Sequence, residues 1–189
     1  MNKHGITEAT PSNVLLGAGV WYKGLEYSGT AWSGTVLGAT SGGGEISIVG
    51  EYLDLELDGA LVKVKGLTVK QGGAATAKIN FAEITDDVLK HGTLFEKAST
   101  SDVTGFNMYQ DKANIVEGDY VENLGFVGFT ADGSKQIVVI FENALCTSGM
   151  TIAPAPKAKA VVSLTFDAYA DNSGDLDRLP VKIYYPTAA

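Results

Sequence analysis

Three carboxylates alternate with leucines in the segment Leu53–Asp58, at Asp54, Glu56 and Asp58. Because neighbouring side chains of a β-strand point to opposite faces, this spacing predicts a strand with one acidic and one apolar face. Carboxylates can exchange protons with a substrate or repel a phosphate. The pair Asp58-Gly59 that follows is a strong turn signal, and the residues after it alternate valine with lysine.

A second group of carboxylates lies near the C-terminus: Asp167, Asp171, Asp175 and Asp177. An EF-hand calcium loop aligned on Gly174 would need a carboxylate at Tyr169 and a glutamate at Pro180, so that motif is excluded. We expect a solvated acidic turn, and a calcium site of another geometry is the alternative. A β-sandwich hydrolase that used these acids would lack a partner acid or base at any recognisable spacing.

The histidines and the cysteine show no spacing for catalysis or metal binding. His4 and His91 form no metal pair and belong to no His-Glu-x-x-His run, so we expect both to be solvated. Cys146 has no histidine nearby in the sequence, which predicts a small buried apolar residue. A single cysteine also excludes an internal disulfide.

Two glycine clusters begin like phosphate-binding motifs and then depart from them. Gly17 and Gly19 start a dinucleotide fingerprint, but Tyr22 stands where the third glycine belongs, and no helix pattern follows. Gly42–Gly44 lack the Gly-Lys-Ser/Thr of a phosphate loop, so we interpret both clusters as structural. The chain also contains no Gly-x-Ser-x-Gly elbow. The sequence therefore predicts a protein that is not an enzyme and that holds no cofactor and no metal ion.

The composition indicates one folded domain over residues 1–189, with a net charge of −8. Among 14 basic residues only Arg178 is an arginine. This argues against tight nucleic-acid binding, but not against a surface past which nucleic acid slides. The longest apolar run, Ile137–Phe141, is too short to cross a membrane, and no secretory signal is visible. We expect a protein of a reducing cytoplasm with no membrane partner.

Apolar periodicity predicts roughly eight to ten strands and one short helix, a mainly β antiparallel sandwich or barrel. The clearest strands are 13–22, 35–40, 45–49, 51–57, 61–70, 75–82, 122–130, 135–142 and 160–169. The helix is predicted at about 84–91, where Thr85 can cap its start and Gly92 its end. A loop at 23–34 and a long loop at 98–120 that includes a strand around 106–109 connect these elements. Terminal arms are predicted at 1–12 and 180–189, and residues 181–185 form either a last strand or part of the second arm.

Four aromatic residues lie beside glycines in the first part of the chain: Trp21, Tyr22, Tyr27 and Trp32. They could form the platform of a monomeric adhesion or carbohydrate-binding module. Alternatively, aromatic residues in this setting close a core edge or fill a subunit interface.

Turn and packing patterns in several segments are similar to those of one known family. The segments are 10–21 (TPSNVLLGAGVW), 37–43 (LGATSGG), 56–59 (ELDG), 64–66 (VKG), 84–90 (ITDDVLK) after the strand 78–81, and 161–170. In these segments the chain resembles the major tail protein, or tail tube protein, of long-tailed bacteriophages. The likeness covers about the first half of the chain and the C-terminal strand.

The resemblance implies that subunits form hexameric rings, that their strands close a β-barrel around a lumen, and that rings stack into the tail tube of a virion. The implied partners are further copies of the chain, a tape-measure protein, tail terminator and tip proteins, and DNA that passes through without tight binding. Assembly would take place in the cytoplasm of the bacterial host.

Acids on a lumen wall would repel phosphates, so DNA could slide past them. We therefore expect one or more of Asp54, Glu56 and Asp58 to face the lumen. The alternative is that they form the ordinary solvated face of an antiparallel sheet.

Overall fold

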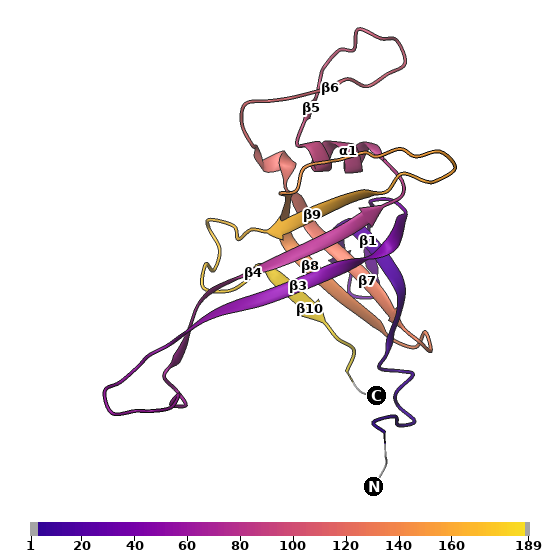
Figure 1. Ribbon diagram of the computed structural model, residues 1–189. Helices are drawn as coiled ribbons and strands as arrows, with labels where there is room; N and C mark the ends of the chain where they lie inside the picture. The colour runs from indigo at the N-terminus through magenta and orange to yellow at the C-terminus, as the bar shows by residue number, and fades with distance from the viewer. Residues whose placement is uncertain (1–3, 188–189) are drawn as a thin grey trace.

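Antiparallel strands account for 46% of the chain and helix for 6%, in a computed structural model that describes residues 4–187 (Figure 1). This confirms the predicted mainly β class with one short helix. The strands are β1 (Leu15–Tyr27), β2 (Trp32–Val36), β3 (Thr40–Asp54), β4 (Thr68–Phe81), β5 (Glu96–Lys97), β6 (Tyr109–Gln110), β7 (Val121–Thr130), β8 (Gln136–Cys146), β9 (Val162–Ala168) and β10 (Val181–Tyr184). The helices are α1 (Asp86–Thr93) and the 3-10 turn η1 (Glu117–Asp119).

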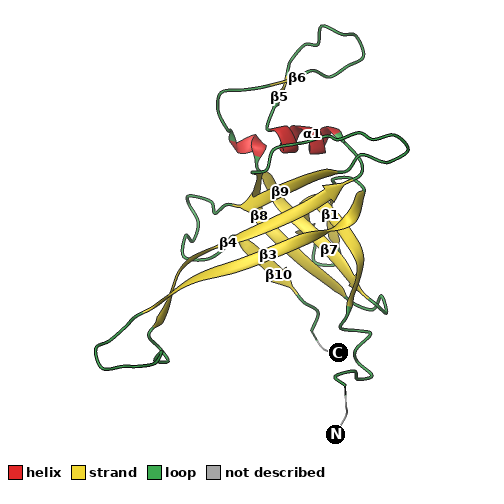
Figure 2. Cartoon of the chain, viewed as in Figure 1, coloured by secondary structure: helices red, strands yellow, loops and turns green. Residues whose placement is uncertain are grey.

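Eight strands form one antiparallel sheet in the order β2-β1-β7-β8-β9-β4-β3, and the eighth, β10, pairs with β8. β8 pairs with two strands in succession along its length: residues 138–141 pair with β10, and residues 144–146 pair with β9. The sheet curves about β8, so that β1 approaches β3 (Figure 2). The predicted strands 122–130 and 135–142 are confirmed as β7 and β8, which pair as a hairpin.

The main core lies inside the curved sheet, because every second side chain of each strand points inward. Its largest fully buried side chains include Ile79, Phe81, Leu124, Phe141, Leu164 and Phe166. A smaller cluster covers the opposite face of β1, β7 and β8 and consists of Leu25, Val127, Val138 and Ile140. These three strands are therefore apolar on both faces, whereas β4 and β9 are apolar on the inner face only.

The helix α1 begins at the predicted cap. The Thr85 hydroxyl accepts a hydrogen bond from the Val88 N–H at 3.2 Å and donates one to the Leu37 carbonyl at 2.8 Å. The cap therefore also ties the helix to the end of β2. The prediction that Gly92 ends the helix is wrong, because the helix continues to Thr93.

Gly92 is needed for packing instead. A Cβ atom added there would lie 2.9 Å from the side chain of Leu164, which is fully buried in β9. The residue that ends the helix is Leu94, at a left-handed φ of 59°. Its backbone N–H donates to the Lys90 carbonyl and so closes the last turn.

The glycine cluster 42–44 lies inside a long strand. Gly42 and Gly43 belong to β3, at φ values of 82° and 79°, and the β3–β4 pairing shifts register beside them. Because a β-bulge accepts glycine at positive φ without ending the ladder, these residues do not stop the strand. The four predicted strands between 45 and 82 are therefore two strands, β3 and β4. The predicted loop 23–34 is mostly the end of β1 and the start of β2.

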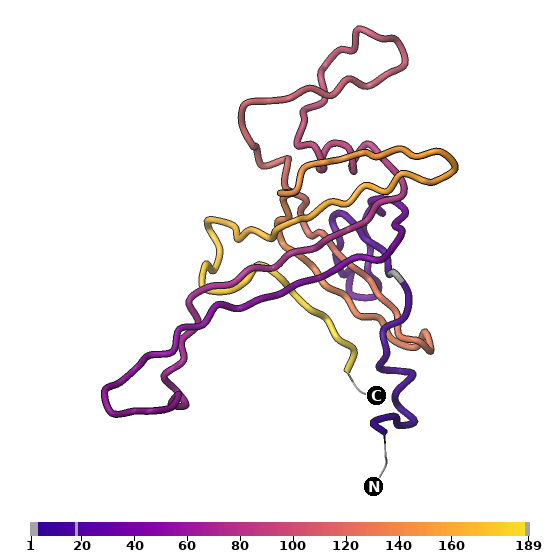
Figure 3. The backbone as a smooth tube through the Cα atoms, viewed as in Figure 1, coloured from indigo at the N-terminus to yellow at the C-terminus, as the bar shows by residue number. Residues whose placement is uncertain are grey.

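Residues 98–120 form the predicted long loop, an excursion from the sheet (Figure 3), and its strand is the two-residue β6 at Tyr109–Gln110 instead of 106–109. It returns through η1, where the buried carboxylate of Asp119 pairs with Lys112 and accepts the Val116 N–H at 2.8 Å. Burial alone would raise the pKa of Asp119, but the hydrogen bonds from Lys112 and Val116 outweigh it and lower that pKa.

The two predicted arms differ in the structure. Residues 4–12 contain no strand, and residues 1–3 of the predicted arm 1–12 lie outside the described part of the chain. For residues 181–185 the prediction is a last strand or an arm, and the structure shows the strand, since Val181–Tyr184 form β10 against β8. Within residues 4–187, no helix has the length and apolar character needed to cross a membrane.

Candidate functional site

The outer half of the β3–β4 hairpin projects from the body of the sheet (Figures 1 and 3). β9 pairs with β4 only from Thr76 to Phe81, whereas β3 and β4 stay paired out to Asp54 and Thr68. Beyond Thr76 the hairpin is a two-stranded ribbon without a third strand among the described residues. Its exposed apolar side chains are Ile48, Val49, Tyr52, Leu53 and Val69.

The tip loop, residues 55–67, connects the two strands of this ribbon. Its first turn is closed by a hydrogen bond from the Ala60 N–H to the Leu57 carbonyl at 3.1 Å, with Gly59 at a φ of 89°. A second turn leads back into β4. These turns explain why the predicted alternating strand ends at Asp54. After one more hydrogen bond, from the Leu55 N–H to the Leu67 carbonyl at 2.9 Å, the backbone turns on itself, and no described strand pairs with residues 56–58.

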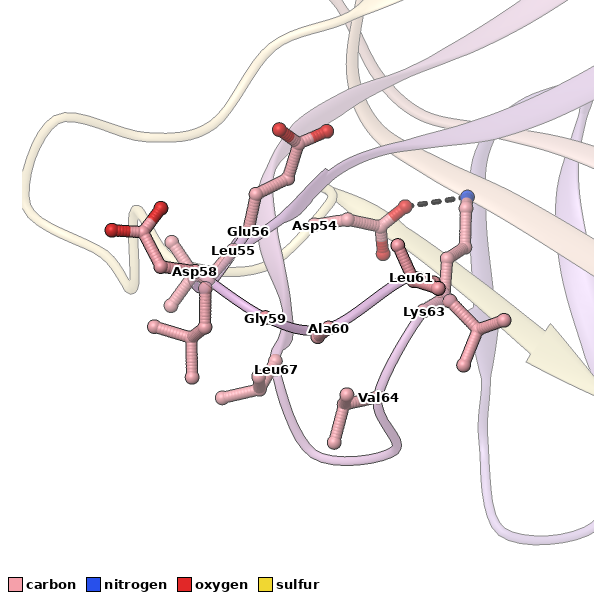
Figure 4. A pocket seen from close by; sticks show the side chains of 12 residues that line it. Asp54, Leu55, Glu56, Asp58, Gly59, Ala60, Leu61, Lys63, Val64 and Leu67 are labelled. Carbon is pink, nitrogen blue, oxygen red and sulfur yellow. Dashed lines mark ion pairs between the residues drawn. The ribbon is translucent and has the colours of Figure 1, made fainter.

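The three predicted site carboxylates separate in the structure (Figure 4). Asp54 is the last residue of β3. Its carboxylate pairs with Lys63 Nζ at 2.5 Å and accepts a hydrogen bond from the Thr68 hydroxyl at 2.6 Å. The hydrogen bonds from Lys63 and Thr68 lower the pKa of Asp54. Glu56 and Asp58 lie in the tip loop and form no ion pair with the described residues. The prediction of three acids on one strand face is therefore wrong.

The tip loop exposes aliphatic side chains to an unusual degree. Leu57, Leu61 and Val62 are 59%, 98% and 78% exposed. The loop surrounds a hollow of about 590 Å³ that only residues 54–67 line, so the rest of the described chain does not cover it. Contiguous exposed apolar side chains at a projecting element mark an interaction site.

A second apolar feature, the aromatic groove, has a volume of about 880 Å³, and its aromatic lining is Tyr22, Tyr27, Trp32, Phe129, Tyr184 and Tyr185. The Trp32 ring lies 5.1 Å from the Tyr27 ring and 4.9 Å from the Tyr184 ring, between centroids. Lys135 is the one charged side chain among the described residues that line the groove. Its Nζ donates to the Asn13 side chain at 3.4 Å.

The predicted aromatic platform is only partly present. Trp21 is 2% exposed and packs in the core at 5.1 Å from Phe126, so it belongs to no surface. Tyr27 and Trp32 do meet in the groove. Sequence reasoning missed Tyr184, whose place opposite Trp32 follows only from the pairing of β10 with β8. The alternation of apolar residues in β10 was the available signal.

The histidines and the cysteine occupy different environments. His91 is 2% exposed, its Nδ1 lies 3.1 Å from the Asp119 carbonyl, and burial lowers its pKa. The prediction of a solvated His91 is wrong, because the segment that returns through η1 covers the helix. His4 is exposed, as predicted. Cys146 is buried, which confirms the prediction of a small apolar core residue.

The acidic turn near the C-terminus is exposed and held by local hydrogen bonds. The Asp171 carboxylate accepts the Ser173 hydroxyl at 2.6 Å and its N–H at 2.8 Å, and these bonds lower the pKa of Asp171. The Arg178 Nε lies 3.8 Å from the Asp175 Oδ2. Over the described range 4–187, no three His, Cys, Asp or Glu side chains are grouped to hold a metal ion.

The chain was also compared with known proteins. No protein-family model matches the sequence, and no curated protein matches it.

Proposed function

We propose that this protein is a self-assembling structural subunit of a phage tail tube, a role without catalysis. Copies of the chain would form closed rings, hexameric by the resemblance, and the rings would stack into a tube in the virion tail. The resemblance in residues 10–21, 37–43 and 84–90 supports the family. The structure supports the more general part of the proposal, which is assembly with other copies.

The projecting β3–β4 ribbon is the observation that carries this proposal. A two-stranded hairpin alone in water is marginally stable, and three or more strands or a covering element are needed to stabilise it. This ribbon exposes Tyr52 and Leu53, and its tip loop exposes Leu61 almost completely. A further copy of the chain would cover these side chains.

Open sheet edges supply a second argument for assembly. β2 and β3 each pair with one neighbour and end the order of the sheet, so each leaves a row of backbone groups without a strand partner among the described residues. Unpaired edges recruit strands from other chains unless they are covered. A contact between two different surfaces of one chain closes into a ring or continues as a filament. A tube of stacked rings needs two such contacts, one that closes each ring and one that continues from ring to ring.

The outward face of β4 and β9 suits a water-filled channel. The side chains that alternate with the core residues on these strands are polar and mostly small: Thr76, Lys78, Asn80, Ser163, Thr165 and Asp167. Such a wall offers phosphates little cationic surface, so DNA would pass without tight binding. That Asp54, Glu56 or Asp58 faces the lumen stays a prediction from the sequence. A tape-measure protein and the terminator and tip proteins of the tail would be the other partners.

Sedimentation velocity over a hundredfold range of protein concentration tests the proposal. We expect species well above the 19.8 kDa chain, growing with concentration, because association follows mass action. A chain that remains monomeric over the whole range and binds soluble glycans would contradict the proposal and favour the carbohydrate-binding alternative.

A further inference from the structure

Two exposed apolar surfaces of the chain are complementary in shape. The tip loop is convex, projects from the sheet and exposes Leu57, Leu61 and Val62. The aromatic groove is concave and offers exposed rings, with Tyr27 and Tyr185 55% and 56% exposed. Aromatic side chains that receive aliphatic ones are typical of the energetic centre of protein interfaces.

The charges at the two surfaces are also complementary. Glu56 and Asp58 flank the apolar residues of the tip loop and have no ion-pair partner among the described residues. Asp54, the third carboxylate of the hairpin end, is already neutralised by Lys63, and Lys65 offsets one of the two remaining negative charges. At the groove, Lys135 carries the charge, and its Nζ donates to the neutral side chain of Asn13.

The two surfaces of one chain do not meet. No residue of the tip loop lines the aromatic groove, and the hollow inside the tip loop is lined by the loop alone. Contact between them therefore requires two copies. We infer that the tip loop of one copy docks in the aromatic groove of a second copy, with Leu61 and Val62 against the rings and Glu56 or Asp58 against Lys135.

This contact is directional, which decides the kind of assembly. The first copy uses its tip loop and keeps its groove free, whereas the second uses its groove and keeps its tip loop free. Each added copy offers the same two surfaces, so the contact propagates until it closes into a ring or continues as a filament. The inference rests on the proposed function and names the two surfaces that would carry it.

A complementation experiment with two variants tests this docking. The tip variant carries Leu61→Asp and Val62→Asp, and the groove variant carries Tyr27→Asp and Tyr185→Asp. All four side chains are exposed, so both variants should fold, which circular dichroism and a thermal melt would verify. Each variant alone should associate more than about tenfold more weakly than the wild type, because each lacks one half of the contact.

Mixed in equal amounts, the two variants should form a dimer and nothing larger. The intact groove of the tip variant can receive the intact tip loop of the groove variant, and neither remaining surface can continue the chain. Leu176→Asp is the matched control, since Leu176 is 68% exposed but lies outside both surfaces, and this variant should assemble as the wild type does.

The outcomes separate the docking from the proposed function. A groove variant that assembles like the wild type, or a mixture that stays monomeric while the wild type assembles, would overturn the docking alone. Quenching of tryptophan fluorescence by soluble glycans in the wild type, abolished in a groove variant that still assembles, would assign the groove to saccharide instead. A wild-type chain that never associates would overturn both proposals.

Discussion

A chain in which the dipeptide Asn-Gly replaces the tip loop, residues 55–67, should fold normally and remain monomeric where the wild type assembles. Asp54 and Thr68 are directly paired across the ribbon, and Asn-Gly is the preferred two-residue connection for such a pair. No residue of the tip loop belongs to either core cluster, so removal of the loop exposes no core residue. Sedimentation velocity would measure the loss of association, and near-UV circular dichroism would verify the fold.

A second chain controls for the length of the loop. In it, Leu57, Leu61, Val62 and Val64 become serine while residues 55–67 keep their number, so the loop loses four exposed aliphatic side chains and keeps its length. This chain should also stay monomeric, because apolar burial is the expected driving force. If either chain forms the same particles as the wild type, the projecting hairpin is not the assembly element.

Phe141→Ala should lower the free energy of unfolding by about 3–5 kcal/mol, the usual cost of removing a buried phenylalanine. Phe141 is fully buried in β8, between Leu124 of β7 and Val181 of β10, and its ring lies 6.5 Å from that of Trp21. Denaturant unfolding at one fixed protein concentration would measure the change, because assembly makes stability depend on concentration.

Phe106→Ala is the matched control for this prediction. Phe106 lies in the excursion between α1 and β7 and is 71% exposed, so its removal should change the stability by less than about 0.5 kcal/mol. A loss below about 1 kcal/mol for Phe141→Ala would contradict the placement of β8 at the centre of the sheet.

Local signals predicted the elements that depend on neighbouring residues. Thr85 followed by two aspartates marks the start of α1, because the cap and the helix dipole act within one turn. The Asp-Gly turn at 132–133 between two apolar runs marks the β7–β8 hairpin in the same way. In both cases the residues that decide the structure lie within a few positions of each other.

Contacts between segments that lie far apart in the sequence determine the features that local patterns did not predict. The alternation through Leu53–Asp58 describes an amphipathic segment, but a strand also needs a partner strand, and within residues 4–187 none pairs with the segment beyond Asp54. His91 is covered by a segment that returns to it at Asp119. Trp32 and Tyr184 meet only because β10 joins the sheet beside β8. The alternation in β10 indicates a strand, but no local pattern places its Tyr184 beside Trp32 in the groove.

Negative-stain electron microscopy of the concentrated, purified wild-type protein tests the central claim most directly. Self-assembly through the projecting hairpin predicts rings with a central channel, or tubes built from such rings, that are absent from the shortened-hairpin chain. A uniform field of single small particles at every concentration would contradict it.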